Sequence, residues 1–428
     1  MIRFAALGLL IGQLCFCSVV FAEDEGDYKF DISYSYGTIQ LLPSLISNSG
    51  FDFDWDKNYS DIWINADFKI TDKLSYAGSL ELTNQPHEFI NTKFSRPDYP
   101  LTTARFQRSI FSYSTKDFVA RVGRDDMLGS HLRPDLFNYP TSGDGFSWKY
   151  SRAGWSAKHV FQVLPAERGN GQLFRRSISY HHLTKDFQNF TLGVGEYFIL
   201  SGEQIGFDLK RLNPFLPYAL NSHDSEADYF SGYVGDSDNS LIKLFLNWRK
   251  KSSEISFNLY VDEFQIDGDD RELFNDAMLL SVLARSEVDL MGARSEIKWG
   301  LAASNPNFGQ HPGPFTTPTI GLFPIFEFTP GMKTLAYFES KTSIGNEWHF
   351  SVAGHAERWV NISQLNASQM NNRAALEALK INFDSRLMLG VEYGLKNYPI
   401  NIVVAGWLGS DSGISLRTQF SSGRKIKQ

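Results

Sequence analysis

The chain of 428 residues has little cysteine, little net charge and few long apolar runs, and each shortage excludes a class of protein. Its two cysteines, Cys15 and Cys17, lie near the N-terminus, so the rest of the chain offers no disulfide, cysteine nucleophile or cysteine metal ligand. The 41 Lys and Arg against 48 Asp and Glu give a net charge of −7, which excludes a dedicated nucleic-acid binder. Beyond the N-terminal segment there is no apolar run of about 18–20 residues, so no membrane-spanning helix is predicted.

The N-terminal residues 1–22 predict a signal peptide. Arg3 precedes the nearly uncharged stretch Phe4–Phe21, and Ala22 supplies the small residue expected before a cleavage site. A retained membrane anchor is the alternative. Cleavage after Ala22 predicts an exported protein without cysteine.

Aromatic residues are abundant, and apolar residues alternate with polar ones over most of the chain. The sequence holds 9 Trp, 18 Tyr and 35 Phe. Between residues 241 and 262 the alternation has the period of two that places successive side chains on opposite faces of a strand. In a barrel, the residues expected to face lipid are Ile242, Leu244, Leu246, Ile255, Phe257 and Leu259. Those expected to face inward are Lys243, Asn247, Ser256 and Asn258.

Short and long connections alternate between the predicted strands. The short ones lie near 71–73, 114–117, 151–154, 184–186 and 250–253. The long ones lie near 37–60, 84–103, 125–144, 164–175, 201–239 and 263–288. Tight periplasmic turns and long external loops are typical of outer-membrane barrels, whereas a soluble sandwich, the alternative, has no reason to keep all long loops at one end.

The sequence therefore predicts a transmembrane antiparallel β-barrel over residues 23–420, followed by a short basic tail at 421–428. The count indicates about 18 strands, with about 16 as the alternative. One of these strands is expected within the Pro-rich stretch 302–333. Apolar spacing predicts helical segments at Arg271–Arg285 and Ser363–Lys380. Outer-membrane lipid is an expected partner, and so is the assembly machinery that receives a closing strand ending at Phe420.

Two sets of polar residues are candidates for function. The inward-facing charges have both signs, which favours a network that closes the lumen; a lining that selects solutes is the alternative. The members of this lumen network are Glu81, Arg121, Lys243, Arg249, Arg294, Glu296 and Lys298. The second set lies in the expected external loops and offers charged groups, amides and aromatic faces to sugars. These glycan-binding candidates are Arg124, Asp125, Asp126, Tyr229, Tyr233, Asp238, Asn239 and Asp262.

Signals for catalysis and cofactors are weak. Gly235-Asp236-Ser237 lacks the apolar strand that a nucleophilic serine needs. His181 and His182 are adjacent on a predicted strand, so their rings point to opposite faces and cannot share one metal ion. We expect no catalytic residue, cofactor or metal.

One region resembles the Wzi-type capsule-assembly proteins of the outer membrane. The resemblance rests on Asn213–Leu220, Gly235–Asn239, the strand Leu241–Arg249 and Leu259–Asp267, with Val122–Gly129 as a degenerate Gly-Arg segment. It implies an occluded barrel of about 18 strands that acts as a lectin for surface polysaccharide. On this basis we expect a non-enzymatic polysaccharide-binding protein; the alternatives are a porin-type channel for small solutes and a barrel-borne hydrolase.

Overall fold

The computed structural model describes most of the predicted strands and few of the connections. The described residues are 28–38, 58–83, 103–128, 142–169, 172–202, 237–262, 277–290, 292–304, 308, 319–320, 323–324, 332–345, 348–360, 381–394, 400–408, 413–421 and 424–426. Within these ranges all regular structure is β-strand. No helix in this part of the chain is long and apolar enough to cross a membrane.

The strands follow one another along the chain as predicted from the alternation. The first nine are β1 (Tyr28–Thr38), β2 (Asn58–Lys69), β3 (Leu74–Thr83), β4 (Thr103–Ser114), β5 (Phe118–Asp125), β6 (Gly143–Arg152), β7 (Trp155–Gly169), β8 (Gln172–Asp186) and β9 (Phe190–Gly202). The next six are β10 (Ser237–Lys250), β11 (Ser253–Asp262), β12 (Ala277–Leu290), β13 (Ala293–Ser304), β14 (Thr319–Ile320) and β15 (Phe323–Pro324). The last six are β16 (Met332–Ile344), β17 (Trp348–Val360), β18 (Ile381–Gly394), β19 (Ile400–Leu408), β20 (Gly413–Ser421) and β21 (Arg424–Ile426).

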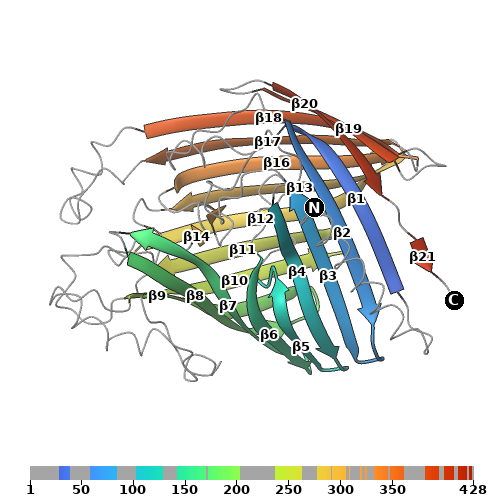
Figure 1. Ribbon diagram of the computed structural model, residues 1–428. Helices are drawn as coiled ribbons and strands as arrows, with labels where there is room; N and C mark the ends of the chain where they lie inside the picture. Colours follow the sequence, from blue (N-terminus) through green and yellow to red (C-terminus); the bar gives the residue numbers. More distant parts are fainter. Residues whose placement is uncertain are drawn as a thin grey trace.

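The sheet closes on itself. Neighbouring strands pair antiparallel from β1 to β20, with β13 beside β16, and β1 pairs with both β2 and β20 (Figure 1). The sheet contains 19 strands. Because the short β21 pairs with β1 beyond the end of β20, 18 strands make up the circumference, and the predicted count is confirmed. Closure leaves no unpaired sheet edge.

Short connections alternate with long ones over much of the barrel, but the β7–β8 and β19–β20 connections are short and break the expected alternation. Ala153 and Gly154 form a two-residue turn with φ of 54° and 74°, the left-handed geometry of the type I′ hairpin. The expected link at 164–175 is wrong, because β7 ends at Gly169 and β8 begins at Gln172. The turns 70–73, 115–117, 153–154, 187–189, 251–252 and 291–292 lie at one end of the barrel, which we assign to the periplasm.

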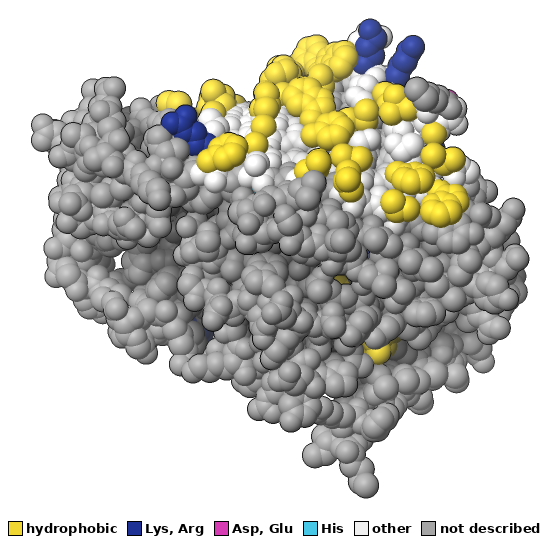
Figure 2. All heavy atoms as spheres, turned by 90° about the horizontal axis from the view of Figure 1, so that it is seen from above, with side chains coloured by type: hydrophobic (Ala, Val, Ile, Leu, Met, Phe, Trp, Pro, Cys, Tyr) yellow, Lys and Arg dark blue, Asp and Glu magenta, His cyan; other side chains and the backbone are white. Residues whose placement is uncertain are grey.

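The outer face of the barrel is apolar and exposed, while its inner face carries polar groups. Leu244 and Phe257 are each 46% exposed, whereas their inward neighbours Ser256 and Asn258 are 4% exposed. The lipid-facing and inward sets predicted for β10 and β11 are confirmed by their register. Figure 2 shows hydrophobic side chains gathered over the uppermost strands of Figure 1, with Lys and Arg at the margins. This is the reverse of a soluble protein, and the barrel spans the outer membrane.

The helical prediction for Arg271–Arg285 is wrong where the structure describes it, because residues 277–285 belong to β12. Leu280 and Leu283 fit a helical stripe, but pairing with β11 and β13 places them on opposite faces of a strand. The expectation of a further barrel strand hidden within 302–333 is wrong, because the additional strand is β12, which precedes that stretch. In the described part of that stretch, β14 and β15 form a separate two-stranded sheet, and β16 begins at Met332. The helical prediction for Ser363–Lys380 lies outside the described residues.

Candidate functional site

Basic residues form a row of cross-strand partners along the inner wall. Lys149 of β6 lies opposite Lys158 of β7, and Lys158 lies opposite His182 of β8. Gly195 of β9 continues the row to Lys243 of β10. Because these positions face inward on adjacent strands, their side chains project into the same part of the lumen. We call Lys149, Lys158, His182 and Lys243 the basic row, and Arg121 of β5 lies on the same face beside it.

Aromatic and carbonyl groups hold the members of the basic row. The Lys243 ammonium lies 4.9 Å from the centre of the Tyr260 ring and 5.4 Å from that of Phe245, within cation–π range. Lys158 Nζ donates to the carbonyl oxygen of Met127 at 3.2 Å. These contacts fix the direction of the two ammonium groups.

An apolar cluster lines the lumen on the external side of the basic row. Tyr180 and Tyr197 stack with ring centres 4.0 Å apart, and Tyr197 lies 6.4 Å from Tyr260. Phe308, which follows β13, packs edge-on against Tyr260 at 6.3 Å and is 1% exposed. Together with Met127, which follows β5, it shows that connection residues enter the lumen and narrow it.

Two inward-facing aromatic rings lie over glycines of neighbouring strands. A Cβ on Gly193 would come within 2.1 Å of the Phe245 ring, and one on Gly300 within 2.4 Å of the Tyr337 ring. Both glycines are direct cross-strand partners of these aromatics. The missing side chains allow the rings to lie flat against the wall, so that they take less room in the lumen.

A network of opposite charges lies on the periplasmic side of the basic row. Arg285 contacts Glu296 at 3.0 Å and Glu287 at 3.4 Å, and Lys298 contacts Glu296 at 3.5 Å. Arg294 contacts Glu287 at 2.5 Å. The further pairs Arg249–Glu254 and Lys341–Glu339 extend it along the wall at 3.0 and 3.4 Å. A cavity of about 550 Å³ opens beside Glu287, Glu296 and Lys341.

The lumen residues predicted from sequence are partly brought together. Arg294, Glu296 and Lys298 join the periplasmic network, and Arg249 joins it through Glu254. Lys243 belongs instead to the basic row. Arg121 is exposed on β5 beside the basic row. Glu81 lies elsewhere on the wall and accepts a hydrogen bond from Gln107 at 2.5 Å. Whether this set closes the lumen or selects solutes stays a prediction.

The glycan-binding candidates do not form one site among the described residues. Arg124 faces outward and pairs with Asp144 through Nε at 2.8 Å, while Asp125 pairs with Arg108 at 3.3 Å. The expectation that Asp238, Asn239 and Asp262 lie in loops is wrong, because β10 begins at Ser237 and β11 ends at Asp262. Asp126 follows β5 directly. Tyr229 and Tyr233 lie outside the described residues.

Sequence reasoning missed Lys149, Lys158, Arg285 and Glu287. A usable signal existed for the first two, because a two-residue turn at Ala153–Gly154 places residues 149 and 158 opposite each other. Arg285 is the last residue of the segment that was predicted as helix, and Glu287 lies in the expected long connection at 263–288.

The two adjacent histidines do point to opposite faces. His181 lies 3.2 Å from Glu196 on the outer face, and His182 Nδ1 lies 2.6 Å from the Tyr180 hydroxyl on the inner face. In the described part of the chain, no group of three or more His, Cys, Asp or Glu side chains is arranged to hold a metal ion.

Comparisons with known proteins return outer-membrane channels. No family model matches the sequence, and no curated protein matches it. Among solved structures, OccK2 (OpdF) of Pseudomonas aeruginosa in complex with glucuronate has 9% identity and a TM-score of 0.49, covering 94% of this chain and 98% of that one. OccD3 (OpdP) of Pseudomonas aeruginosa has 9% identity and a TM-score of 0.48, covering 94% and 92%. OccAB4 of Acinetobacter baumannii has 10% identity and a TM-score of 0.47, covering 94% and 99%.

The resemblance to Wzi-type capsule-assembly proteins is wrong. The similar structures named above are porins of the Occ type and not capsule-assembly proteins, and no family model supports the resemblance. The parts of the matching segments that the structure describes fall on strands β10 and β11 and on the end of β5, where alternation and turn chemistry alone favour such sequences. Asn213–Leu220 lies outside the described residues.

Proposed function

We propose that the protein is a porin-type channel that admits small organic anions across the outer membrane. The observation that carries this proposal is the basic row, which gathers Lys149, Lys158 and Lys243 on one stretch of the inner wall. Cations fixed on the wall of a narrow pore attract anions and repel cations. This function was the alternative to the lectin-like interpretation, and the channel is now the better supported of the two.

The surroundings of the basic row favour anions that also carry an apolar part. Ammonium groups give carboxylates and phosphates charge-assisted hydrogen bonds. Tyr180 and Tyr197 lie immediately on the external side of the row, and Tyr260 lies opposite Lys243. All three rings are buried in one apolar cluster, which makes the wall beside the row apolar and favours a ring or hydrocarbon chain there. A solute entering from outside passes these rings first, then the basic row, and then the mixed charges of the periplasmic network.

The proposal is tested by the reversal potential of the purified barrel in planar bilayers under a KCl gradient. We expect conductance with a preference for Cl⁻ over K⁺. Lys158→Gln and Lys243→Gln should each lower the Cl⁻/K⁺ permeability ratio by about two- to fivefold, since a unit charge 4–8 Å from an ion in water contributes about 0.5–1 kcal/mol.

The matched control is Lys73→Gln, which removes the same charge from a periplasmic turn. It should leave the ratio unchanged. A folded barrel that conducts no ions, or one whose ion preference does not respond to either lumen substitution, would contradict the channel proposal.

A further inference from the structure

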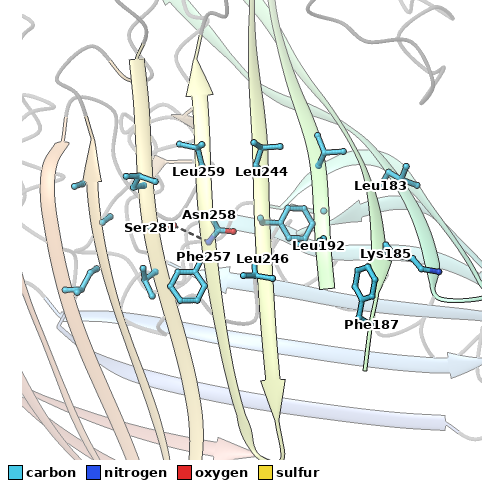
Figure 3. Close-up of a pocket in the computed structure, with 18 of the residues that line it drawn as sticks. Leu183, Lys185, Phe187, Leu192, Leu244, Leu246, Phe257, Asn258, Leu259 and Ser281 are labelled. Atoms are coloured by element: carbon cyan, nitrogen blue, oxygen red, sulfur yellow. Dashed lines mark hydrogen bonds between the residues drawn. The ribbon is translucent and has the colours of Figure 1, made fainter. Parts of the chain in front are cut away.

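A large apolar groove runs along the outer face of the barrel. Its volume is about 1040 Å³, and it extends from β8 across to β13. Leu192, Leu244, Phe257, Leu280 and Leu301 line it with exposed apolar side chains. Figure 3 shows Leu244 and Leu246 beside Phe257 and Leu259 on two adjacent strands. A concave apolar surface of this size accommodates a chain of methylene groups.

A lysine marks the β8 side of this groove. Lys185 lines it near Phe187 (Figure 3), and its ammonium lies 4.9 Å from the centre of the Trp155 ring. The same ammonium donates to the carbonyl oxygen of Ala153 at 3.1 Å. Since Ala153 belongs to the turn between β6 and β7, the lysine head group lies at the periplasmic end of the wall. At this end of the wall the ammonium group is at the height of the lipid phosphates.

The outward-facing residues around this edge carry positive charge only. They are Leu183, Lys185, Phe190, Leu192, Leu246, Trp248, Lys250, Ser253 and Ile255. None of these described residues is Asp or Glu. Lys250 lies two positions beyond Trp248 and is exposed. Tryptophan and lysine side by side at a membrane interface favour phospholipid head groups.

We propose that this groove and its basic edge form a binding site for an anionic phospholipid of the periplasmic leaflet. An acyl chain lies along the apolar groove, and the phosphate group lies at Lys185, with Lys250 adding positive charge farther along the same edge. The indole rings of Trp155 and Trp248 lie at the level of the glycerol backbone. The site is separate from the lumen and does not depend on the proposed channel function.

Native mass spectrometry of the whole barrel in detergent tests the head-group preference. Phosphatidylglycerol and phosphatidylethanolamine of equal chain length are offered in equal amounts. We expect phosphatidylglycerol to be retained preferentially, and Lys185→Gln and Lys250→Gln each to lower its apparent affinity by about fivefold. Lys73→Gln and Lys116→Gln remove the same charge from other periplasmic turns and should have no effect.

A second pair of variants tests the groove itself. Ala303→Trp fills the groove and should lower phosphatidylglycerol retention with both lysines intact, whereas Ala336→Trp changes another outward-facing alanine that does not line it. Equal retention of the two lipids, or retention unchanged by Ala303→Trp, would overturn the proposal. Detection of dimers of the barrel without bound lipid would also overturn the proposal, because a second copy of the chain would then cover the groove.

Discussion

Lys149 and Lys158 lie directly opposite each other on the inner wall of the barrel, as cross-strand partners of β6 and β7. Like charges at opposite positions destabilise a sheet, so repulsion between the two lysines lowers the stability of the folded barrel. The benefit is a concentration of positive charge beside a lumen that Met127 and Phe308 narrow. This relationship links the stability of the barrel to its ion preference.

Lys149→Met should stabilise the barrel and weaken its preference for anions. Removing the repulsion should increase the free energy of unfolding by about 0.2–1 kcal/mol, and Lys149→Glu should increase it further by creating an ion pair with Lys158. The measurement is the unfolding midpoint from heat-dependent mobility in detergent gels, together with the Cl⁻/K⁺ permeability ratio. Lower stability of both variants would show that the two lysines do not repel each other.

The anion preference should decrease as salt increases. The Debye length shortens from about 10 Å at 0.1 M to about 3 Å at 1 M salt, so the field of the basic row reaches less of the lumen. Permeability ratios measured at the same twofold KCl gradient and increasing mean concentration test this. A ratio that is independent of concentration would point to size selection in place of charge.

Gly193→Ala should destabilise the barrel because the new methyl group collides with the Phe245 ring. Overpacking of this kind costs about 1–3 kcal/mol. Combining it with Phe245→Leu should recover most of the loss, since the leucine can turn away from the new methyl group. A double-mutant cycle on the unfolding midpoint gives the coupling, and independent effects of the two substitutions would refute the contact.

Glu296→Gln should increase anion preference and lower stability together. Glu296 contacts both Arg285 and Lys298, so its neutralisation leaves two cations less well compensated. The loss for a partly exposed network of this type is about 1 kcal/mol. Asp72→Asn, which removes the partner of Lys69 in a periplasmic turn, is the control and should change neither the permeability ratio nor the unfolding midpoint.

His159→Phe should stabilise the barrel. The His159 ring lies on the outer face near Phe146 and Trp148, and its two nitrogens have no hydrogen-bond partner in the part of the chain that the structure describes. An unpaired buried polar group costs about 1–3 kcal/mol, which phenylalanine removes. His181→Phe is the contrasting variant, because it separates Glu196 from its partner and should destabilise. Equal effects of both substitutions would contradict this assignment.

The sequence by itself determined the strands, their inner and outer faces and the end of the barrel at which the turns lie. Each of these follows from local rules: alternation places Leu244 and Lys243 on opposite faces, and Ala153-Gly154 allows a tight turn. The same rules failed at β12, where Leu280 and Leu283 fit a helical spacing as well as a strand. Pairing with two neighbouring strands decides between the two.

Only the tertiary structure decided which distant residues meet. The register across β6–β10 joins Lys149, Lys158 and Lys243 in one cross-strand row, and a shift of one residue in any hairpin would break the row. The packing of Phe308 against Tyr260 and the alignment of apolar residues into the outer groove likewise join separate strands. Periodicity fixes the direction of a side chain on its own strand, whereas the height of one strand against the next is set by hydrogen-bond pairing around the closed barrel.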